Sequence, residues 1–460
     1  FQLDVPTISI ADANKGFKVL QGSELTITPI VDSFLETSYS WQINGEDISN
    51  ELTCTLPTIE LGEYQVRFAT HNEDGDDEVT FKVEVCSPDQ VDFNWTFLQT
   101  EYNMSAGRTI RIKPVDVNNA LDAVYTWTVD NEQVQSGEND TYLFTSEQQG
   151  EHTVKVEMRN SYILATQTLK INVCPPAGTY QRKISATSSA SMNKVYEYLP
   201  APGQFINENH NTTTMAEACT YAEERINQTA YVSLGGFGGY IIVGFDHSIV
   251  NDGDYNIAIT GNAFDGSSEP GIVWVMQDEN GDGLPNDTWY ELRGSEYGKA
   301  ETWQDYAVTY HKPTGIQLPT PWTDNHGQSG SIDYLGAFHR QDYFYPAWVK
   351  EKQYTLRGTR LKERNYDQSG NGTYWVNDSY EWGYADNFSA IDRLTDDDNY
   401  NAGPSDNHFK ISHAVTFDGK DANLKYVDFI KVQVGVNSKS GWLGEISTEV
   451  FGIKDFNMLE

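Results

Sequence analysis

The stretch TFKVEVC at residues 80–86 returns as TLKINVC at residues 168–174, and each copy ends on a cysteine. Apolar and polar residues alternate through both stretches, and this period of two is typical of a β-strand with one buried face. A strand that recurs at a fixed distance along the chain indicates a duplicated domain. The two stretches therefore predict two β domains of the same design.

Further anchor residues recur upstream of these strands in the same order. The recurring pairs are Gly22 and Gly107, Pro29 and Pro114, Trp41 and Trp127, Gly62 and Gly150, and Asn72 and Asn160. This order predicts two Ig-like sandwiches at residues 1–86 and 87–174. Both tryptophans fall mid-strand, where an Ig-like sandwich packs an aromatic ring between its two sheets.

Residues 175–460 carry a longer series of strand-like segments, which predicts one larger β-sandwich or jelly-roll domain. The almost wholly apolar run at residues 240–245 is typical of a strand buried on both faces. A minor helical element is predicted at residues 214–228, because Met215, Ala218 and Ala222 share one face of a helix there. The predicted fold class is all-β, with two tandem Ig-like sandwiches followed by this larger domain.

The charge of the chain excludes some partners. Its 67 acidic and 31 basic residues give a formal net charge of −36, which repels phosphate backbones and anionic headgroups, so we expect no nucleic-acid partner. No run of 18 apolar residues exists, so no membrane span is expected in this chain. Many tyrosines and few cysteines favour an exported protein, whose trimmed signal or lipid anchor would leave no trace in this sequence.

A calcium loop is predicted within DENGDGLPNDTWYE, residues 278–291. Asp278, Asn280 and Asp282 occupy positions 1, 3 and 5 of such a loop, and Gly283 at position 6 permits its sharp turn. Trp289 stands where an EF-hand has its bidentate glutamate, and the flanking segments are strand-like. The stretch therefore resembles the loops of repeat-type extracellular calcium sites instead.

The ligands that would close this loop are the carbonyl of Leu284 and the carboxylate of Asp287 or Glu291, with Trp289 and Tyr290 held against the loop. The alternative is a hairpin of Asx turns without a metal. Calcium is favoured because acids crowded into so few residues repel one another unless a cation lies among them.

Tryptophans in polar loops predict a ligand site in the third domain. Eight of the eleven tryptophans lie beyond residue 270, and two of them occur in the polar stretches PTPWTDNHG and YEWGYADN. A flat polar ligand needs an aromatic ring for stacking and polar neighbours for hydrogen bonds. The expected contacts are Trp322, Asp324, Asn325, Trp382 and Asn387. The alternative is that such rings fill the core, which we expect of Trp274 and Trp442.

Two family resemblances can be identified in these segments. The stretches YSWQINGE, GEYQV and KVEV, with their copies YTWTVDNE, GEHTV and KINV, resemble PKD-type Ig-like domains, which implies spacer or adhesion modules. The stretches VYEYLPAPGQFIN, GGFGGYIIVGFDH, WGYADN and GWLGEISTEVFGIKDF resemble a family of Bacteroidetes cell-surface proteins. That resemblance implies a lipoprotein anchored at the extracellular face of the outer membrane, near nutrient-uptake machinery such as that for corrinoids. It supplies no catalytic residues.

Three functions follow as expectations. The favoured one is a surface binding protein whose third domain, stabilised by Ca²⁺, captures a glycan, a corrinoid or another small polar ligand. The second is a glycoside hydrolase or other carbohydrate-active enzyme, because abundant acids supply the carboxylates that such chemistry uses. The third is a structural adhesin. No nucleophile or metalloprotease signature is present to favour an enzyme.

Overall fold

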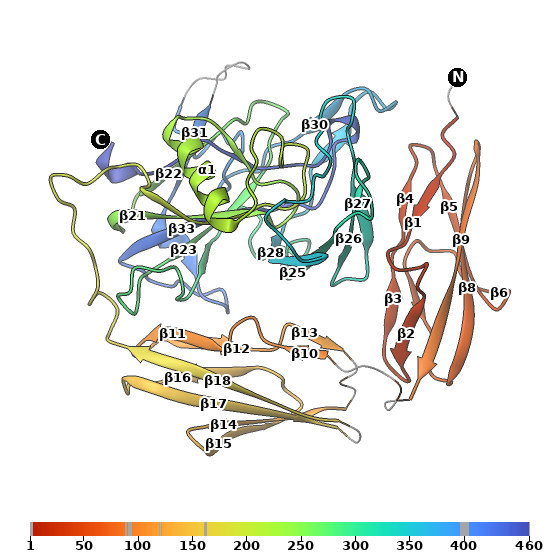
Figure 1. Cartoon of the computed structure of the whole chain (residues 1–460), viewed down its shortest axis with the longest axis horizontal. Helices are drawn as coiled ribbons and strands as arrows, with labels where there is room; N and C mark the ends of the chain where they lie inside the picture. The colour runs from red at the N-terminus through yellow and green to blue at the C-terminus, as the bar shows by residue number, and fades with distance from the viewer. Residues whose placement is uncertain are drawn as a thin grey trace. The chain divides into compact units, whose positions relative to one another are not determined.

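The computed structural model describes residues 3–87, 90, 94–118, 120, 122–160, 163–395 and 404–459. The chain divides into two compact units. The first comprises Phe1–Ala177 and Thr323–Gly330, and the second comprises Gly178–Trp322 and Ser331–Glu460. Strands dominate both units, and one α-helix occurs among the described residues (Figure 1), so the all-β prediction is confirmed. The exact domain limits 1–86, 87–174 and 175–460 stay a prediction.

The first repeat forms a sandwich of nine strands. They are β1 (Thr7–Ser9), β2 (Phe17–Leu20), β3 (Leu25–Ile27), β4 (Ile30–Asp32), β5 (Ser38–Ile43), β6 (Glu46–Ser49), β7 (Cys54–Leu56), β8 (Gly62–Asn72) and β9 (Gly75–Cys86). One sheet has the order β2-β9-β8-β5-β6, and β3 pairs with β7 and β1 with β4. Trp41 is fully buried in the core between them.

The second repeat reproduces this topology strand for strand. Its strands are β10 (Asn94–Thr96), β11 (Glu101–Ser105), β12 (Thr109–Ile112), β13 (Asp116–Asn118), β14 (Val124–Val129), β15 (Glu132–Gly137), β16 (Tyr142–Thr145), β17 (Gly150–Arg159) and β18 (Leu164–Cys174). The main sheet has the order β11-β18-β17-β14-β15, and β12 pairs with β16 and β10 with β13. Trp127 is buried at the place of Trp41, as predicted.

The opening strand of each main sheet runs parallel to the closing one. In the first sandwich β2 pairs with β9 from Phe17 opposite Val83 to Leu20 opposite Cys86. In the second, β11 pairs with β18 from residue 101 opposite 170 to residue 105 opposite 174. The stretches 80–86 and 168–174 therefore lie inside the sheets, bonded to neighbours on both sides, and their alternating residues line the core on one face.

One buried histidine distinguishes the two sandwiches. His152 Nδ1 lies 2.7 Å from the carboxylate of Asp130, and its Nε2 lies 3.1 Å from the carbonyl of Gln148. Burial acts to lower the pKa of His152, but these two acceptors outweigh it, and the pKa is raised. The first sandwich has Tyr64 and Asn44 at the corresponding places, so it lacks this titrating pair.

We expect His152→Gln to destabilise the second sandwich more at acid pH than at alkaline pH. A group whose pKa is raised by folding contributes stability below its unfolded value of about 6.5, and that stability is lost as the pH rises through the folded pKa. The effect should stay below about 1 kcal/mol, because Asp130 is half exposed. Chemical denaturation on either side of that pH measures it, with Tyr64→Gln as control. An equal loss at both pH values would contradict the assignment.

The third domain is built on a six-stranded sheet with the order β19-β21-β33-β23-β24-β32 and a three-stranded sheet with the order β31-β22-β35. Its strands are β19 (Lys194–Leu199), β20 (Val232–Ser233), β21 (Tyr240–Val250), β22 (Ile257–Gly261), β23 (Gly271–Met276), β24 (Tyr290–Leu292), β25 (Trp303–His311), β26 (Thr320–Asp324), β27 (Ser329–Ile332), β28 (Gln353–Arg360), β29 (Asn365–Asp367), β30 (Trp375–Asn377), β31 (Ser405–Phe409), β32 (Ala414–Val415), β33 (Tyr426–Val434), β34 (Glu449–Val450) and β35 (Gly452–Asp455). The apolar run 240–245 lies in β21, flanked by β19 and β33, as the sequence predicts.

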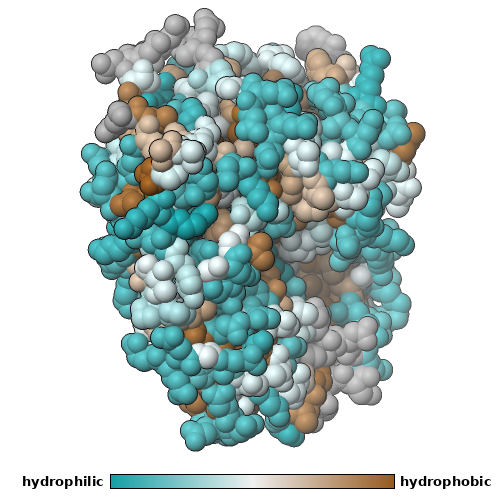
Figure 2. Space-filling view, turned by 60° about the vertical axis from the view of Figure 1, so that its left-hand side comes forward, coloured by the Kyte–Doolittle hydropathy of each residue, from teal (hydrophilic) through white to brown (hydrophobic). Residues whose placement is uncertain are grey.

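The predicted helix is present as α1 (Met215–Asn227). Thr214 caps it by accepting a hydrogen bond from the amide of Glu217, at 3.2 Å. Ala218 and Ala222 on its apolar face are buried in the main core of the domain. Within the described part of the chain, no helix is both long and apolar enough to cross a bilayer. The face drawn in Figure 2 is mostly hydrophilic, in keeping with the acidic composition.

Candidate functional site

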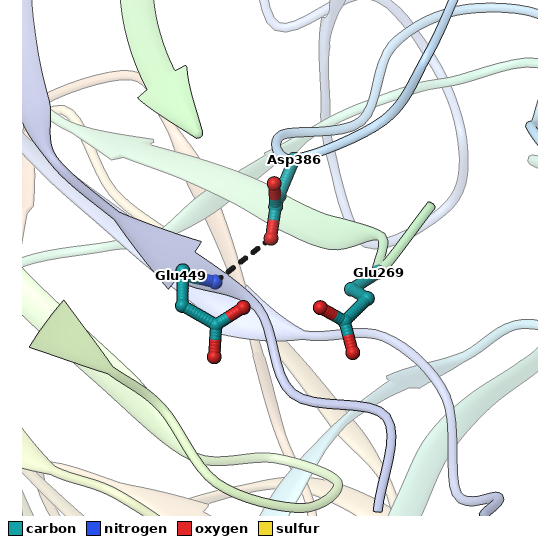
Figure 3. Close-up of side chains that lie close together, drawn as sticks. All are labelled: Glu269, Asp386 and Glu449. Atoms are coloured by element: carbon teal, nitrogen blue, oxygen red, sulfur yellow. Dashed lines mark hydrogen bonds between the residues drawn. The ribbon is translucent and has the colours of Figure 1, made fainter. Parts of the chain in front are cut away.

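Three carboxylates meet in the third domain. Among the described residues, Glu269, Asp386 and Glu449 form one group of acids whose oxygens lie within 4.8 Å of one another. Figure 3 shows the three side chains entering from separate segments with their carboxylates turned toward a common space. Asp386 and Glu449 are buried, and Glu269 is partly buried.

Backbone hydrogen bonds fix the three segments against one another. Glu269 lies just before β23, and its amide donates to the carbonyl of Asp386 at 2.9 Å. The neighbouring residues Gly271 and Ala385 exchange two backbone hydrogen bonds, each of 2.9 Å. Glu449 lies in β34, which pairs with β20. Main-chain hydrogen bonds therefore fix the positions of the backbone segments that carry the three acids.

Asp386 organises the backbone around it. Its two carboxylate oxygens accept hydrogen bonds from the amides of Asn262 and Glu449, at 2.8 and 2.9 Å. Gly261 makes room for this arrangement, since a Cβ at that position would lie 2.5 Å from Oδ1 of Asp386. Asp386 itself adopts a positive φ of 52°, a conformation that aspartate tolerates better than most residues. The loop is thus bent to bring this carboxylate to the cluster.

Burial makes full ionisation of the cluster unfavourable. It raises the pKa of Glu269 to about 8 and that of Asp386 to about 7, and the charge of Asp386 adds to the rise at Glu269. The pKa of Glu449 is also raised, by burial first and then by the charges of the other two acids. At neutral pH the three groups therefore share protons unless a cation compensates them.

The cluster lines one wall of a cavity of about 420 Å³. Glu269, Glu449 and a further acid, Glu445, line the cavity, whereas Asp386 is not among its lining residues. Burial raises the pKa of Glu445 to about 8. Amide and hydroxyl groups also line the cavity, contributed by Gln204, Asn262, Ser267, Asn377, Ser440 and Ser447.

Aromatic rings complete the lining of this cavity. They belong to Phe205, Tyr231, Phe338 and Trp442. Trp442 is 49% exposed and Phe338 is 64% exposed, and their ring centroids lie 6.2 Å apart. The expectation that Trp442 fills the core is therefore wrong, because this residue lies in a short 3₁₀ turn at Gly441–Leu443. Trp274 is partly buried beside the core.

The five ligand contacts expected from the sequence have different surroundings, and their convergence on one site stays a prediction. Trp322 lies in β26 and is only 8% exposed, which corrects the idea of an open ring in a polar loop. Asp324 caps the following turn by accepting hydrogen bonds from the amides of His326 and Gln328. Asn325 is exposed in that turn.

Asn387 and Trp382 have different roles. The amide of Asn387 is fully buried and bonds both the N–H and the carbonyl of Tyr380, at 2.8 and 2.9 Å, so it secures a loop and does not face a ligand. Trp382 lines a separate cavity of about 290 Å³ together with Arg293, Lys410 and His413. Trp322, Asp324 and Asn325 are not among the residues lining that cavity. A ligand contact at Trp382 stays a prediction.

The loop 278–287 has the turn geometry that both of its interpretations require. Asp278 accepts hydrogen bonds from the amides of Gly281 and Gly283, at 2.8 and 3.0 Å, and both glycines have a positive φ. Asn280 Oδ1 accepts from the amide of Asp282, and Asp282 Oδ1 accepts from the amide of Leu284. These are Asx turns, and Oδ2 of Asp282 also accepts hydrogen bonds from the side-chain amides of Asn280 and Asn286.

The three expected closing ligands have different surroundings. Asp287 is buried, and burial together with the charges of nearby acids raises its pKa to about 8; its Oδ1 has no hydrogen-bond partner in the described structure. Glu291 accepts a 2.6 Å hydrogen bond from Thr359 and interacts with the charge of Lys431, and its role as a calcium ligand stays a prediction. The carbonyl of Leu284 accepts from the amide of Asn286.

The aromatic pair after the loop has a structural explanation. Trp289 lies over the ammonium of Lys431, whose Nζ is 4.9 Å from the ring centroid of Trp289 and 4.8 Å from that of Trp274. Tyr290 belongs to the main core. The expectation that both rings pack against the loop stays a prediction.

Sequence reasoning missed the acidic cluster and its cavity. The local sequence gives little signal, since Glu449 stands between the polar residues Ser447 and Thr448 and the apolar residues Val450 and Phe451. Glu269 and Asp386 stand in polar loops that resemble many others in the chain. Only the fold brings these three residues together.

Comparison with known proteins supports the first part of this description. A family profile described as PKD-like domain matches residues 5–72 and 97–160, so the chain carries tandem PKD/Ig-like domains. PKD-like domains are typical of extracellular proteins. A comparison with curated protein sequences finds no match.

Solved structures resemble the chain only weakly. The fibronectin(III)-like modules of Clostridium thermocellum CbhA are 17% identical, with a TM-score of 0.19, and the match covers 39% of this chain and 99% of that one. A chimeric titin Z1Z2 carrying a decorin peptide is 20% identical, with a TM-score of 0.22 and coverages of 38% and 98%. The four N-terminal Ig domains of Dscam1 isoform 4.44 are 16% identical, with a TM-score of 0.16 and coverages of 38% and 46%. At such TM-scores the likeness says nothing about function.

Proposed function

We propose that the chain is a cell-surface binding protein whose third domain captures a polar ligand in the 420 Å³ cavity, with the tandem sandwiches as a spacer. The observation that carries this proposal is the composition of the cavity wall. Exposed aromatic rings at Trp442 and Phe338 line the same cavity as buried acids and amides. A few well-placed polar groups against aromatic surface are characteristic of small-molecule sites.

A hydroxyl-rich ligand fits this wall best. An aromatic ring covers the apolar face of a sugar, while carboxylates and amides bond its hydroxyl groups. The volume lies toward the lower end of the range of about 300 to 1,000 Å³ for small-molecule pockets, which suits a short glycan better than a bulky corrinoid. A corrinoid stays the second ligand to be tested.

Replacing Trp442 with alanine should weaken ligand binding by about 1 to 3 kcal/mol while leaving the melting temperature almost unchanged. The ring is half exposed, so its removal should lower the free energy of ligand binding and leave the stability of the folded domain almost unchanged. Calorimetry with a panel of glycans and corrinoids measures the change, and Tyr374→Ala, an exposed ring outside the cavity, is the matched control. A ligand bound equally well by the Trp442 variant would place the site elsewhere.

We also propose that the loop 278–287 binds Ca²⁺ and stabilises the third domain. The charges of Asp278 and Asp282 act on Asp287. The buried Oδ1 of Asp287 has no hydrogen-bond donor among the described residues, and a bound cation would take the place of that missing donor. Oxygen ligands of this kind are those that calcium prefers. Asp278, Asn280 and Asp282 would be the first ligands.

Calcium at about 1 mM should stabilise the third domain by about 0.5 to 1.5 kcal/mol, given dissociation constants of about 0.1 to 1 mM for extracellular sites. Thermal melting with and without chelator measures this difference. Asp282→Ala should abolish the response to calcium at the loop, whereas Asp324→Ala, which removes a turn-capping aspartate outside the loop, should keep it. A calcium response that survives Asp282→Ala undiminished would argue against the loop.

We place the protein at the extracellular face of the outer membrane, held by a lipid anchor beside nutrient-uptake machinery. The PKD-like domains and the resemblance to Bacteroidetes surface proteins support this location. Cleavage of the chain by protease added to intact cells would test it.

A carbohydrate-active enzyme is the second candidate. It is favoured by one observation: Glu269 and Glu449 are close acids on a cavity wall with raised pKa values, and general acid catalysis needs a carboxyl that keeps its proton near neutral pH. Turnover of a labelled glycan panel separates the enzyme from the binding protein. A purely structural adhesin would bind none of these ligands.

A further inference from the structure

The acidic cluster has no basic side chain among the described residues to balance its charge. Within the described chain, none of Glu269, Asp386 and Glu449 forms an ion pair with a lysine, arginine or histidine. Three carboxylates at such distances repel one another strongly when buried. Main-chain hydrogen bonds hold the three segments in place, so the carboxylates could separate only by rotation of their side chains.

A second observation in the same cavity points to a missing ligand. Glu445 is 5% exposed and lines the cavity beside Glu269, on which its charge acts. Its Oε1 accepts a 2.7 Å hydrogen bond from the amide of Gln204, whereas its buried Oε2 has no partner in the described structure. A buried carboxylate oxygen without a donor is unfavourable, so a hydrated ion or another bound group is the natural source of that donor.

We propose that Glu269, Asp386 and Glu449 hold a divalent cation of the calcium class at the wall of the cavity. The donor set consists of carboxylate oxygens alone, which suits Ca²⁺ and does not suit metals that prefer nitrogen or sulfur. Ca²⁺ takes six to eight oxygens, more than three carboxylates supply unless each binds with both oxygens. Waters or ligand hydroxyls fill the rest, and one of them donates to Glu445.

The cation would also contact the ligand directly, an inference that rests on the proposed function. Glu269 and Glu449 face the cavity, so the open coordination positions of the cation face it as well. Two adjacent hydroxyls of a sugar can replace two waters on such an ion. The cation then bridges the protein and a ligand with vicinal hydroxyls, while the ring of Trp442 covers the ligand from the side.

Calorimetric titration of the full chain with Ca²⁺ tests the site. The titration is carried out in an Asp282→Ala background, so that calcium binding at the loop 278–287 does not contribute to the signal. In that background we expect one remaining calcium site, which Glu269→Gln or Glu449→Gln should weaken by roughly tenfold or more. Asp392→Asn, which neutralises a buried acid outside the cluster, should leave the affinity unchanged. A titration without binding, or with equal affinity in all variants, would overturn the proposal.

Two further measurements keep the outcomes distinct. Crystals of the unaltered chain soaked in Tb³⁺ should give an anomalous peak among the three carboxylates, and a map without that peak contradicts the site even if the variants fail to fold. Glycan binding is then compared with and without chelator, in the Asp282→Ala background. If the chain binds calcium but no glycan, the proposed function is wrong and the calcium site stands. If it binds a glycan equally well with and without chelator, the proposed function stands and the calcium bridge to the ligand is wrong.

Discussion

Replacing Trp127 with alanine should lower the free energy of unfolding of the second sandwich by about 3 to 5 kcal/mol, the usual cost of truncating a fully buried tryptophan. The ring packs between the sheets against Phe97 and Tyr142, with centroids 6.2 and 5.5 Å away, so the vacated space cannot close easily. Chemical denaturation of the full chain, followed by hydrogen exchange of amides in β14 and β17, measures the loss. A loss below about 1 kcal/mol would contradict this packing.

The duplication supplies the matched control. Trp41 occupies the same place in the first sandwich, but its Nε1 donates a 2.9 Å hydrogen bond to the carbonyl of Glu51, whereas Nε1 of Trp127 has no partner among the described residues. Trp41→Phe should therefore destabilise its sandwich by about 1 kcal/mol more than Trp127→Phe destabilises the other. Equal losses would show that this hydrogen bond contributes nothing.

Asp455→Ala should destabilise the third domain by about 3 to 5 kcal/mol. His247 and Asp455 are both fully buried, and Nε2 of the histidine lies 2.7 Å from Oδ2 of the aspartate. Removing the carboxylate leaves a buried ring nitrogen without its partner, and it also removes the acceptor of the hydrogen bond from the amide of Asn457. Denaturation of the full chain, monitored by exchange in β22 and β35, measures this effect.

A second carboxylate contacts the ring of His247 and provides a control for the effect of burial. Asp246 lies 2.7 Å from Nδ1 of His247, but its side chain is 34% exposed, so water can take its place. Asp246→Ala should therefore cost less than about 1 kcal/mol. If the two variants were equally destabilised, burial would not be the reason for the larger effect at Asp455.

The fold was accessible from the sequence because its determinants are local and repeated. Alternating residues in the stretches 80–86 and 168–174 predict strands, and the spacing of Trp41 and Trp127 predicts their packing. The helix at α1 was equally readable, since its apolar residues recur with a period near 3.6. None of these inferences required knowledge of which segments meet in space.

The candidate site was only partly accessible for the opposite reason. The loop 278–287 could be found because its oxygens lie within ten residues of one another. Glu269 and Glu449 are separated by 180 positions, and nothing in either local sequence indicates the other. Trp322 and Trp442 were misassigned because polar neighbours in sequence say little about burial. Trp322 lies in a strand that buries it, and the turn of Trp442 leaves its ring exposed.

The parallel pairing of β2 with β9 and of β11 with β18 has a mechanical consequence. When the chain is pulled at its two ends, the opening and closing strands of each sandwich are drawn in opposite directions along their length. The load therefore shears the whole row of hydrogen bonds in these pairs at once, instead of unzipping them one after another. Two such sandwiches along one chain would therefore resist a pulling force better than sandwiches whose terminal strands unzip.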